Sequence, residues 1–164
     1  MGRAERKSRH AGLRLAVPGR GEIAVRHVLL DLNGTLAVDG RIPPAIRRRL
    51  RQLAATLSVR VLTADTFGTA RAEVRGLPVC LERVASGRAK ARLAARLAPQ
   101  GLVAVGNGAN DVGMLRKATL AIAVLGREGM DPSLCKTADV LVGRVEDGLD
   151  LLLRDGRLAA TLRR

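Results

Sequence analysis

The sequence predicts an α/β fold in which a parallel sheet is covered by helices on both faces. Short, unbroken apolar runs recur along the chain, as at residues 28–30 and 102–105, and segments with helical spacing of apolar residues alternate with them. Strands buried on both faces have such unbroken apolar runs, and their alternation with helices is typical of parallel sheets. The length of 164 residues is enough for one domain with a single core.

The chain begins with a segment that we expect to lie outside the folded domain. Residues 1–12 are polar, basic and aperiodic, which predicts a disordered tail, and residues 13–164 are expected to form a single domain. At the start of that domain, apolar runs at residues 13–17 and 22–32 flank Pro18-Gly19-Arg20-Gly21. This pattern predicts two strands joined by a turn, an N-terminal β-hairpin.

The rest of the chain alternates predicted helices and strands. Apolar residues three and four positions apart predict helices at residues 43–57, 67–75, 86–97, 111–117, 145–153 and 158–162. Short apolar runs predict strands at residues 59–62, 78–81, 102–105, 120–124 and 138–142. Pro43-Pro44 and Ser86 mark helix starts, because proline is tolerated in a first helical turn and a serine side chain can cap one.

The formal net charge is +14, with arginine far more frequent than lysine. Such a charge permits contact with nucleic acid, anionic membranes or other polyanions. The chain has no Trp or Tyr and a single Phe, Phe67, so it lacks a base-stacking platform, and its arginines are scattered. We therefore expect a generally basic surface rather than sequence-specific binding of nucleic acid.

Two features predict a cytoplasmic protein without a membrane partner. No apolar run is long enough to cross a bilayer, and no signal-peptide core follows the basic residues 1–10. Cys80 and Cys135 are far apart and lack the spacing of a metal site. They are expected to be buried thiols of a cytoplasmic protein.

Two segments that follow predicted strands carry the candidate chemistry. Asp31-Leu32-Asn33-Gly34-Thr35 follows one apolar run, and Gly106-Asn107-Gly108-Ala109-Asn110-Asp111 follows another. The carboxyl ends of parallel strands meet at one edge of a sheet, where open α/β proteins hold ligands. A dinucleotide-binding loop is excluded for the second segment, because Asp111 stands where that loop needs a third glycine. The pair predicts a metal-assisted phosphoryl-transfer site.

Together with Thr63-Ala64-Asp65 and Lys90, these segments occur in the order of the four motifs of the haloacid dehalogenase (HAD) superfamily. The chain resembles most its small soluble members that are similar to the phosphorylation domain of P-type ATPases, whose motifs read DKTGT, TGD and GDGxND. The resemblance covers residues 13–164 and implies a Rossmann-like core. An ion-pumping role is excluded, because the chain has no membrane segments.

The resemblance implies a catalytic role for four residues. Asp31 would be the nucleophile that forms an aspartyl-phosphate, and its alternative role is to cap the turn after a strand. Thr63 would donate its hydroxyl to a phosphoryl oxygen, and Lys90 would neutralise the charge that develops there. An exposed helical lysine is the alternative for Lys90, with Arg88 as a competitor. Asn33 takes the position of the usual acid/base residue.

The resemblance also implies a Mg²⁺ cofactor and a set of supporting residues. The metal ligands would be Asp31, the backbone carbonyl of Asn33, Asn107 and Asp111, since Mg²⁺ prefers oxygen ligands. Asp65 matches the acidic residue of the TGD motif, or it caps the helix that follows. Phosphate-binding and supporting roles fall to the remaining motif residues, which are Gly34, Thr35, Ala64, Gly106, Gly108 and Asn110.

Two asparagines depart from the superfamily pattern. Asn33 replaces the Asp that protonates the leaving oxygen, a contribution typically worth ~10²–10⁴-fold. Asn107 replaces the first acidic residue of the GDGxND pattern and brings no charge to a metal. We expect slow turnover of alkyl phosphates and a smaller loss of rate for phosphates with good leaving groups. We also expect a longer-lived aspartyl-phosphate and weak Mg²⁺ binding.

The spacing of the motifs leaves no room for a cap domain. Asp31 and Thr63 are separated by 31 residues, and Thr63 and Lys90 by 26. Residues 37–40 have room only for a small flap. The site is therefore expected to be open to a large substrate, or to be closed by a second subunit of a homo-oligomer.

These observations favour a Mg²⁺-dependent phosphohydrolase or phosphotransferase acting on a phosphorylated substrate. The first alternative is a phosphate- or nucleotide-binding regulatory module with attenuated catalysis. The second alternative is a basic nucleic-acid-associated protein, whose binding would fall steeply with salt.

Overall fold

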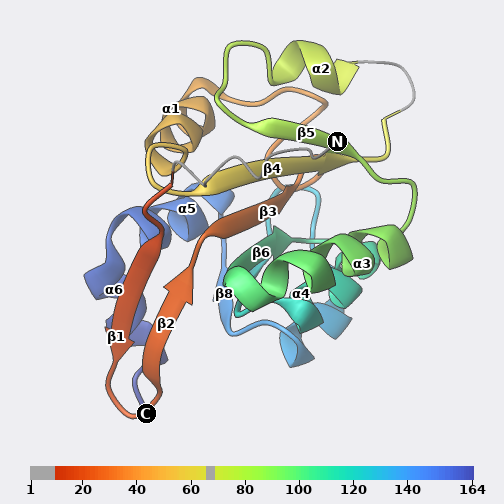
Figure 1. Cartoon of the computed structure of the whole chain (residues 1–164). Helices are drawn as coiled ribbons and strands as arrows, with labels where there is room; N and C mark the ends of the chain where they lie inside the picture. Colours follow the sequence, from red (N-terminus) through yellow and green to blue (C-terminus); the bar gives the residue numbers. More distant parts are fainter. Residues whose placement is uncertain (1–9, 66–68) are drawn as a thin grey trace, which may run out of the picture.

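A six-stranded parallel sheet forms the centre of the computed structural model, which describes residues 10–65 and 69–164. The strand order is β5-β4-β3-β6-β7-β8, and all five pairings are parallel. The strands of this sheet are β3 (His27–Asp31), β4 (Ser58–Thr63), β5 (Cys80–Arg83), β6 (Leu102–Gly106), β7 (Leu120–Val124) and β8 (Val140–Val142). The predicted parallel sheet is confirmed (Figure 1).

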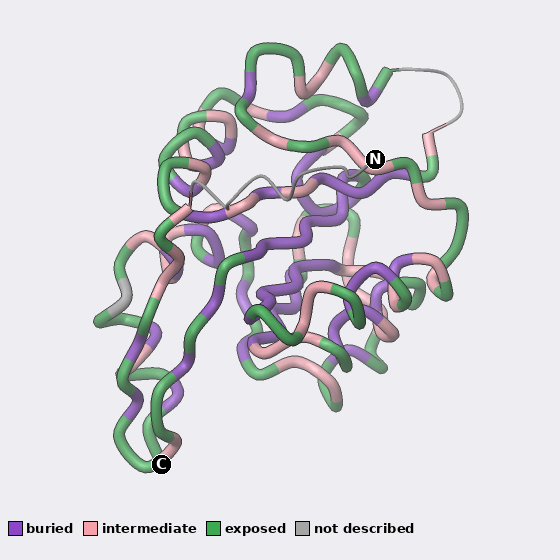
Figure 2. Tube along the Cα trace, in the orientation of Figure 1, coloured by how far each residue is buried: buried purple, intermediate pink, exposed green. Residues whose placement is uncertain are grey.

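Helices cover both faces of the sheet, because successive side chains of each strand point to opposite faces. Val28 and Leu30 of β3 pack into one apolar cluster, and Leu29 packs into another. The first cluster includes side chains of α1 (Pro44–Leu53) and α5 (Val145–Leu153). The second includes side chains of α3 (Gly87–Leu97) and α4 (Val112–Lys117). Figure 2 shows the buried strands between these two layers.

The other helices are short or lie at the end of the chain. They are α2 (Thr69–Glu73), α6 (Asp155–Leu162) and the 3₁₀ helices η1 (Ala98–Gln100), η2 (Ala109–Asp111) and η3 (Pro132–Lys136). Residues 67–75 were expected to form one helix, of which α2 is the part that the structure describes as helical; Phe67 lies outside the described residues. The sequence did not predict η3.

The prediction of a single strand over residues 22–32 is wrong, because this segment forms two strands. β2 (Gly21–Val25) pairs antiparallel with β1 (Leu13–Val17) in the N-terminal hairpin, whereas β3 joins the parallel sheet. The chain changes partners at Arg26, where the N–H groups of Arg26 and His27 both donate to the carbonyl of Gly101. Glycine is required at position 101, since a Cβ on Gly101 would lie 2.0 Å from the Ala24 carbonyl oxygen.

Two further strand predictions are shifted. The strand predicted at 78–81 is β5, which begins at Cys80; Pro78 has no N–H to give to a sheet. The strand predicted at 138–142 is β8, which begins at Val140, because the N–H of Ala138 donates to Leu134 at the end of η3.

The two ends of the described chain are tied to the domain. Residues 1–9 of the expected tail lie outside the described residues, whereas the N–H of Gly12 donates to the Thr56 carbonyl at 2.9 Å. At the other end, the N–H of Arg164 donates to the Pro18 carbonyl at 3.1 Å, which brings the C-terminus to the hairpin turn (Figure 1).

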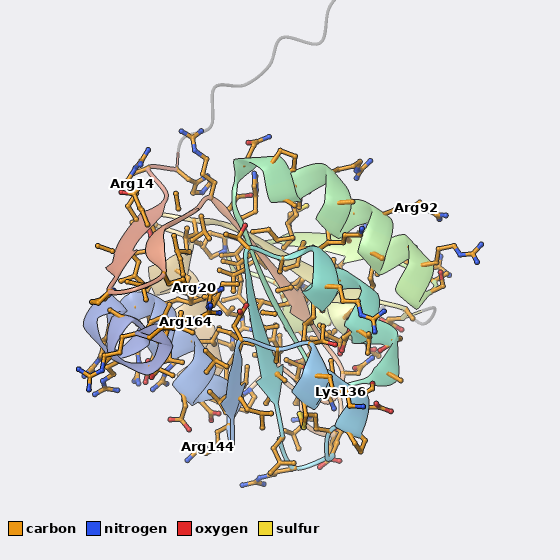
Figure 3. The ribbon with its side chains drawn as sticks, turned by 90° about the horizontal axis from the view of Figure 1, so that it is seen from below. Arg14, Arg20, Arg92, Lys136, Arg144 and Arg164 are labelled. Atoms are coloured by element: carbon orange, nitrogen blue, oxygen red, sulfur yellow. The ribbon has the colours of Figure 1, made fainter. Side chains whose placement is uncertain are left out.

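The surface tests the predictions about the membrane, the cysteines and the basic residues. No helix in the described parts of the chain is long and apolar enough to cross a membrane. Cys80 and Cys135 are free and exposed, so the prediction of buried thiols is wrong. Basic side chains labelled in Figure 3, such as Arg14, Arg92 and Lys136, come from different elements and are spread over the molecule.

Candidate active site

The motif residues meet at the carboxyl edge of the sheet because β4, β3 and β6 are neighbours. Asp31 is the last residue of β3 and is paired in register with Leu62 of β4, one residue before Thr63. On the other side, β3 pairs with β6, which ends at Gly106. The three loops that follow these strands therefore start side by side.

Lys90 joins two of these loops from the neighbouring helix. Its Nζ lies 2.5 Å from Oδ1 of Asp31 and 2.7 Å from Oδ1 of Asp111, and its side chain is only 3% exposed. The alternative of an exposed helical lysine is therefore wrong. Arg88 is exposed and makes no described contact with these carboxylates.

Close packing of α3 brings Lys90 to this position. The Ser86 hydroxyl caps the helix by accepting the N–H of Ala89, as its sequence predicts. At Gly87 a Cβ would lie 2.7 Å from the Asn110 carbonyl oxygen, and at Gly113 of α4 a Cβ would lie 2.9 Å from Cβ of Ala91. Small residues thus let α3 approach both the Asp111 loop and α4.

Asp111 is fully buried and all its described bonds are within the site. Its Oδ1 accepts from Lys90, and its Oδ2 accepts the backbone N–H groups of Asn107 and Gly108, each at 3.0 Å. Gly106 leaves the space for this carboxylate, since a Cβ there would lie 2.4 Å from Oδ2. Asp111 therefore shapes its own loop and holds Lys90.

Gly108 and Asn110, the other two predicted site residues of the loop after β6, make fewer contacts in the site. A Cβ on Gly108 would lie 2.8 Å from Oδ1 of Asn110, so glycine is needed for close approach there as well. Asn110 itself is exposed, and no described hydrogen bond shows its side chain ordering the loop.

The charges at the centre of the site are unequal, with two carboxylates around one ammonium. Burial raises the pKa of Asp31 to about 6, and the repulsion of Asp111 adds to this, while Lys90 acts in the opposite direction. Burial alone would lower the pKa of Lys90, but Asp31 and Asp111 more than offset it and raise that pKa. Lys90 is therefore held as a cation, and Asp31 ionises near pH 6.

Thr63 presents a hydroxyl at the same edge. Its Oγ1 accepts the N–H of Asp65 at 2.9 Å, which leaves the hydroxyl proton for another acceptor. The Asp65 carboxylate accepts from the Thr69 hydroxyl and from the N–H of Ala70, at 3.1 and 2.7 Å. These contacts with the start of α2 are the ones that the predicted role of Asp65 as a helix cap requires.

A cleft of about 310 Å³ opens between the β3 and β4 loops. Its lining includes Asn33, Ala64, Asp65 and Gly40. The small flap predicted at residues 37–40 contributes Gly40: Val38 and Arg41 exchange two backbone hydrogen bonds, around a turn in which Asp39 and Gly40 both have positive φ. Asn33 is exposed to this cleft rather than packed in the core.

Asn107 binds the β3 loop to a loop that sequence reasoning missed. Its Oδ1 accepts from the Thr35 hydroxyl at 3.1 Å, and its Nδ2 donates to the carbonyl of Gly129 at 3.0 Å. Its own carbonyl accepts the N–H of Asp131 at 2.9 Å. The segment over residues 125–131, between β7 and η3, is thereby part of the site.

Glu128 in this segment was also missed. Gly34 has φ +80°, and a Cβ on it would lie 3.1 Å from Oε2 of Glu128, 2.7 Å from Nδ2 of Asn107 and 3.0 Å from its Oδ1. The Asn107 amide and the Glu128 carboxylate therefore border the same small space. No motif in the sequence marks Glu128.

The donor set fits a hard divalent cation, although with few charges. Asp31 has a second oxygen beyond the one that Lys90 holds, and no described backbone hydrogen bond ends on the carbonyl of Asn33. The Asn107 amide oxygen accepts one described hydrogen bond, from Thr35, and its second lone pair makes it a third donor, whereas the fully buried Asp111 accepts described bonds on both oxygens. Within residues 10–65 and 69–164, no three His, Cys, Asp or Glu side chains are clustered as a metal site.

Comparison with known proteins gives two relatives by sequence. No family model matches the chain. Uncharacterized protein MJ0073 of Methanocaldococcus jannaschii is 44% identical over 62 residues, which are 38% of this chain and 67% of that protein. Uncharacterized protein MJ0072 of the same organism is 46% identical over 39 residues, 24% of this chain and 89% of that protein.

Solved structures identify the fold. A Legionella pneumophila protein assigned to subfamily III A of the HAD superfamily hydrolases matches with a TM-score of 0.67 and 17% identity, covering 84% of this chain and 87% of that one. A cobalt-bound deoxy-D-mannose-octulosonate 8-phosphate phosphatase from Haemophilus influenzae matches with a TM-score of 0.66 and 13% identity over 85% and 94%.

A third structure contains ligands. The 3-deoxy-D-manno-octulosonate 8-phosphate phosphatase of Moraxella catarrhalis, in complex with magnesium, phosphate and a KDO molecule, has a TM-score of 0.63 and 12% identity over 83% of this chain and 92% of that one. At these identities the likeness is one of fold, and the chain has the fold of the HAD superfamily.

Proposed function

We propose that this chain, which belongs to the same family as the two Methanocaldococcus proteins and has the HAD fold, is a phosphohydrolase or phosphotransferase that works through Asp31. The observation that carries the proposal is the position of Lys90, which contacts Asp31 and Asp111 at the carboxyl edge of the sheet. Phosphoryl transfer needs a nucleophile and fixed positive charge at one point. The Asp31 carboxylate and the Lys90 ammonium, which lie in direct contact and are buried, would meet both needs.

The proposed reaction has two steps. An oxygen of the Asp31 carboxylate attacks phosphorus, the bond to the leaving oxygen breaks, and that oxygen leaves with a proton from water. Water or an acceptor hydroxyl then attacks the phosphoryl group of the aspartyl-phosphate, which releases the phosphorylated product and restores the Asp31 carboxylate. In this proposal, Lys90 and the Thr63 hydroxyl stabilise negative charge on the phosphoryl oxygens.

Mg²⁺ is the proposed cofactor, held by Asp31, the Asn33 carbonyl and the Asn107 amide oxygen. When bound, it supplies further positive charge to the phosphoryl oxygens. Asp111 was predicted as a direct ligand, but its oxygens are occupied by Lys90 and two backbone N–H groups. We assign Asp111 the role of holding Lys90 and the loop after β6.

Asn33 sets the expected substrate preference. It lines the open cleft together with Ala64, and in this proposal the leaving group departs through that cleft. An amide can donate a hydrogen bond but cannot supply and recover a proton. Phosphates with good leaving groups are therefore expected to react faster than alkyl phosphates. The short flap leaves the cleft open, which suits a large substrate or closure by a second subunit.

The test is phosphate release from an aryl phosphate, with and without Mg²⁺. Asp31→Asn removes the nucleophile and should abolish turnover. Asp39→Asn is the matched control, because Asp39 lies in the exposed flap and asparagine tolerates its positive φ of 51°. Equal rates for wild type and Asp31→Asn would contradict the proposal.

A second candidate is a phosphate- or nucleotide-binding module with little turnover. The observation that favours it is the pair of asparagines, since the Asn107 amide is bound on both sides by Thr35 and Gly129. Such a module would bind phosphate near Lys90 and lose that binding in Lys90→Met, with no turnover in either protein. The same proposal includes a cytoplasmic location, a homo-oligomer, and a generally basic surface without sequence-specific binding of nucleic acid.

A further inference from the structure

We infer that Glu128 supplies the carboxylate that the metal site lacks at position 107, and so contributes to holding the divalent cation. This inference rests on the proposed function, because it concerns the cation of the same site. It adds a residue that lies outside all four motifs and joins the site from the loop between β7 and η3.

Glu128 lies close to residues of the proposed metal site. Oε2 of Glu128 and the Asn107 amide both lie within about 3 Å of the point where a Cβ of Gly34 would stand. Gly34 directly follows Asn33, whose carbonyl is a proposed ligand. The carboxylate of Glu128, an exposed residue, thus lies near the Asn107 amide and beside the residue that follows Asn33.

The loop that carries Glu128 is anchored on both sides. Before it, the N–H groups of Leu125 and Gly126 donate to the carbonyls of Val142 and Gly143, at 2.9 and 3.1 Å. After it, Asn107 donates to the Gly129 carbonyl and accepts the N–H of Asp131. Asn107 therefore fixes the backbone next to Glu128 while its own amide borders the same space.

The charge of Glu128 also suits the site. A site with Asp31 as its one available carboxylate brings little negative charge to a divalent cation, and Lys90 already offsets part of that charge. Glu128 takes part in no hydrogen bond or ion pair found among the described residues, so its carboxylate is available. Mg²⁺ keeps several waters in proteins, so Glu128 can act directly or by accepting a bond from a metal-bound water.

The experiment measures Mn²⁺ binding by titration calorimetry, since Mn²⁺ takes the same carboxylate and carbonyl ligands as Mg²⁺. Glu128→Gln keeps the shape of the side chain and should weaken Mn²⁺ binding about 10- to 100-fold, the range found when residues supporting a metal site are changed. Asp147→Asn is the control, because Asp147 is exposed in the first turn of α5 and its loss changes the net charge equally.

A double variant tests the replacement itself. Adding Asn107→Asp to Glu128→Gln returns one carboxylate to the site and should recover most of the lost affinity. Urea unfolding of each variant confirms that the fold is intact, which matters because Asn107 donates to Gly129. Unchanged Mn²⁺ affinity in Glu128→Gln, or a loss no larger than in Asp147→Asn, would overturn the inference.

Failure of the proposed function gives a different result. If the wild-type chain shows no saturable Mn²⁺ binding, the metal part of the proposed function and this inference both fall. Phosphate release that depends on Asp31 in the presence of a chelator would then show that the aspartyl chemistry stands without the cation. Saturable binding that Glu128→Gln leaves unchanged removes Glu128 alone.

Discussion

Nζ of Lys90 lies 2.5 Å from Oδ1 of Asp31, although the two residues are 59 positions apart in the chain. The contact is buried, and the same ammonium lies 2.7 Å from Asp111. A buried lysine needs a carboxylate partner, and here two carboxylates share one ammonium, so the lysine is the charge that the site cannot lose without leaving buried carboxylates unpaired. The site is therefore a single electrostatic unit that joins α3 to the loops after β3 and β6.

Removing the ammonium should damage both stability and activity. Lys90→Met leaves two buried carboxylates without their partner, which costs on the order of 3–5 kcal/mol in the free energy of unfolding. Lys117→Met, at an exposed position in the last turn of α4, is the control and should change this free energy little. Urea unfolding measures both, and a loss below about 1 kcal/mol in Lys90→Met would contradict the buried triad.

The raised pKa of Asp31 predicts opposite pH dependences for activity and stability. The nucleophile must be ionised, so kcat/KM for an aryl phosphate should rise as pH rises through about 6. The folded state binds this proton more tightly than the unfolded state, whose pKa is near the ordinary value of 3.8. The contribution of Asp31 to stability is therefore fully present below pH 3.8 and is lost as pH rises to about 6.

A variant isolates this effect on stability. Asp31→Asn removes the buried charge and should raise the free energy of unfolding at neutral pH by on the order of 1–3 kcal/mol, although it abolishes activity. Near pH 4 the difference should shrink, because wild-type Asp31 is then protonated in the folded state. A stabilisation that does not change with pH would contradict the raised pKa.

Restoring the acid/base residue should raise turnover. Asn33→Asp places a carboxylate at the open cleft, where it can protonate a leaving oxygen and later activate water. The gain should be larger for alkyl phosphates, by up to ~10²–10⁴-fold, than for aryl phosphates, whose leaving groups need less help from an acid. Phosphate release from one substrate of each class gives the comparison, and no gain with either would show that Asn33 does not limit catalysis.

Gly34 should be intolerant of any side chain. Gly34→Ala brings a Cβ to 2.7 Å from the Asn107 amide at a φ of +80°, which should cost on the order of 2 kcal/mol or more in stability and reduce activity. Gly40→Ala is the matched control, because Gly40 has φ +76° but nothing within 4 Å of the added Cβ. Equal losses in the two variants would mean that the backbone angle, rather than contact with Asn107, explains the effect.

Most of the fold could be predicted from the sequence because the strands of a parallel sheet are buried on both faces. The unbroken apolar runs ending at Asp31, Thr63 and Gly106 located the strands that carry the site. The break at Arg26 could not be predicted, because it depends on the Gly101 carbonyl, which is distant in sequence. The parallel sheet was predictable, but the point at which one apolar run changes partners was not.

The site was predicted where motifs fix it and missed where contacts between loops fix it. The motifs predicted that Asp31 and Lys90 lie together, which the structure shows, although the burial of Lys90 depends on small residues in α3 and α4. The occupied oxygens of Asp111 and the nearness of Glu128 to Gly34 could not be predicted. Both depend on how the loops after β6 and β7 fold against each other.

The central claim is that Asp31 becomes phosphorylated, and the most direct measurement is to trap that state. The protein is mixed with an aryl phosphate and Mg²⁺, quenched in acid, and its intact mass is recorded. The account predicts that wild type gains the mass of one phosphoryl group, that hydroxylamine removes it, and that Asp31→Asn never gains it. Phosphate release by wild type with no such adduct, at a rate that Asp31→Asn matches, would contradict the account.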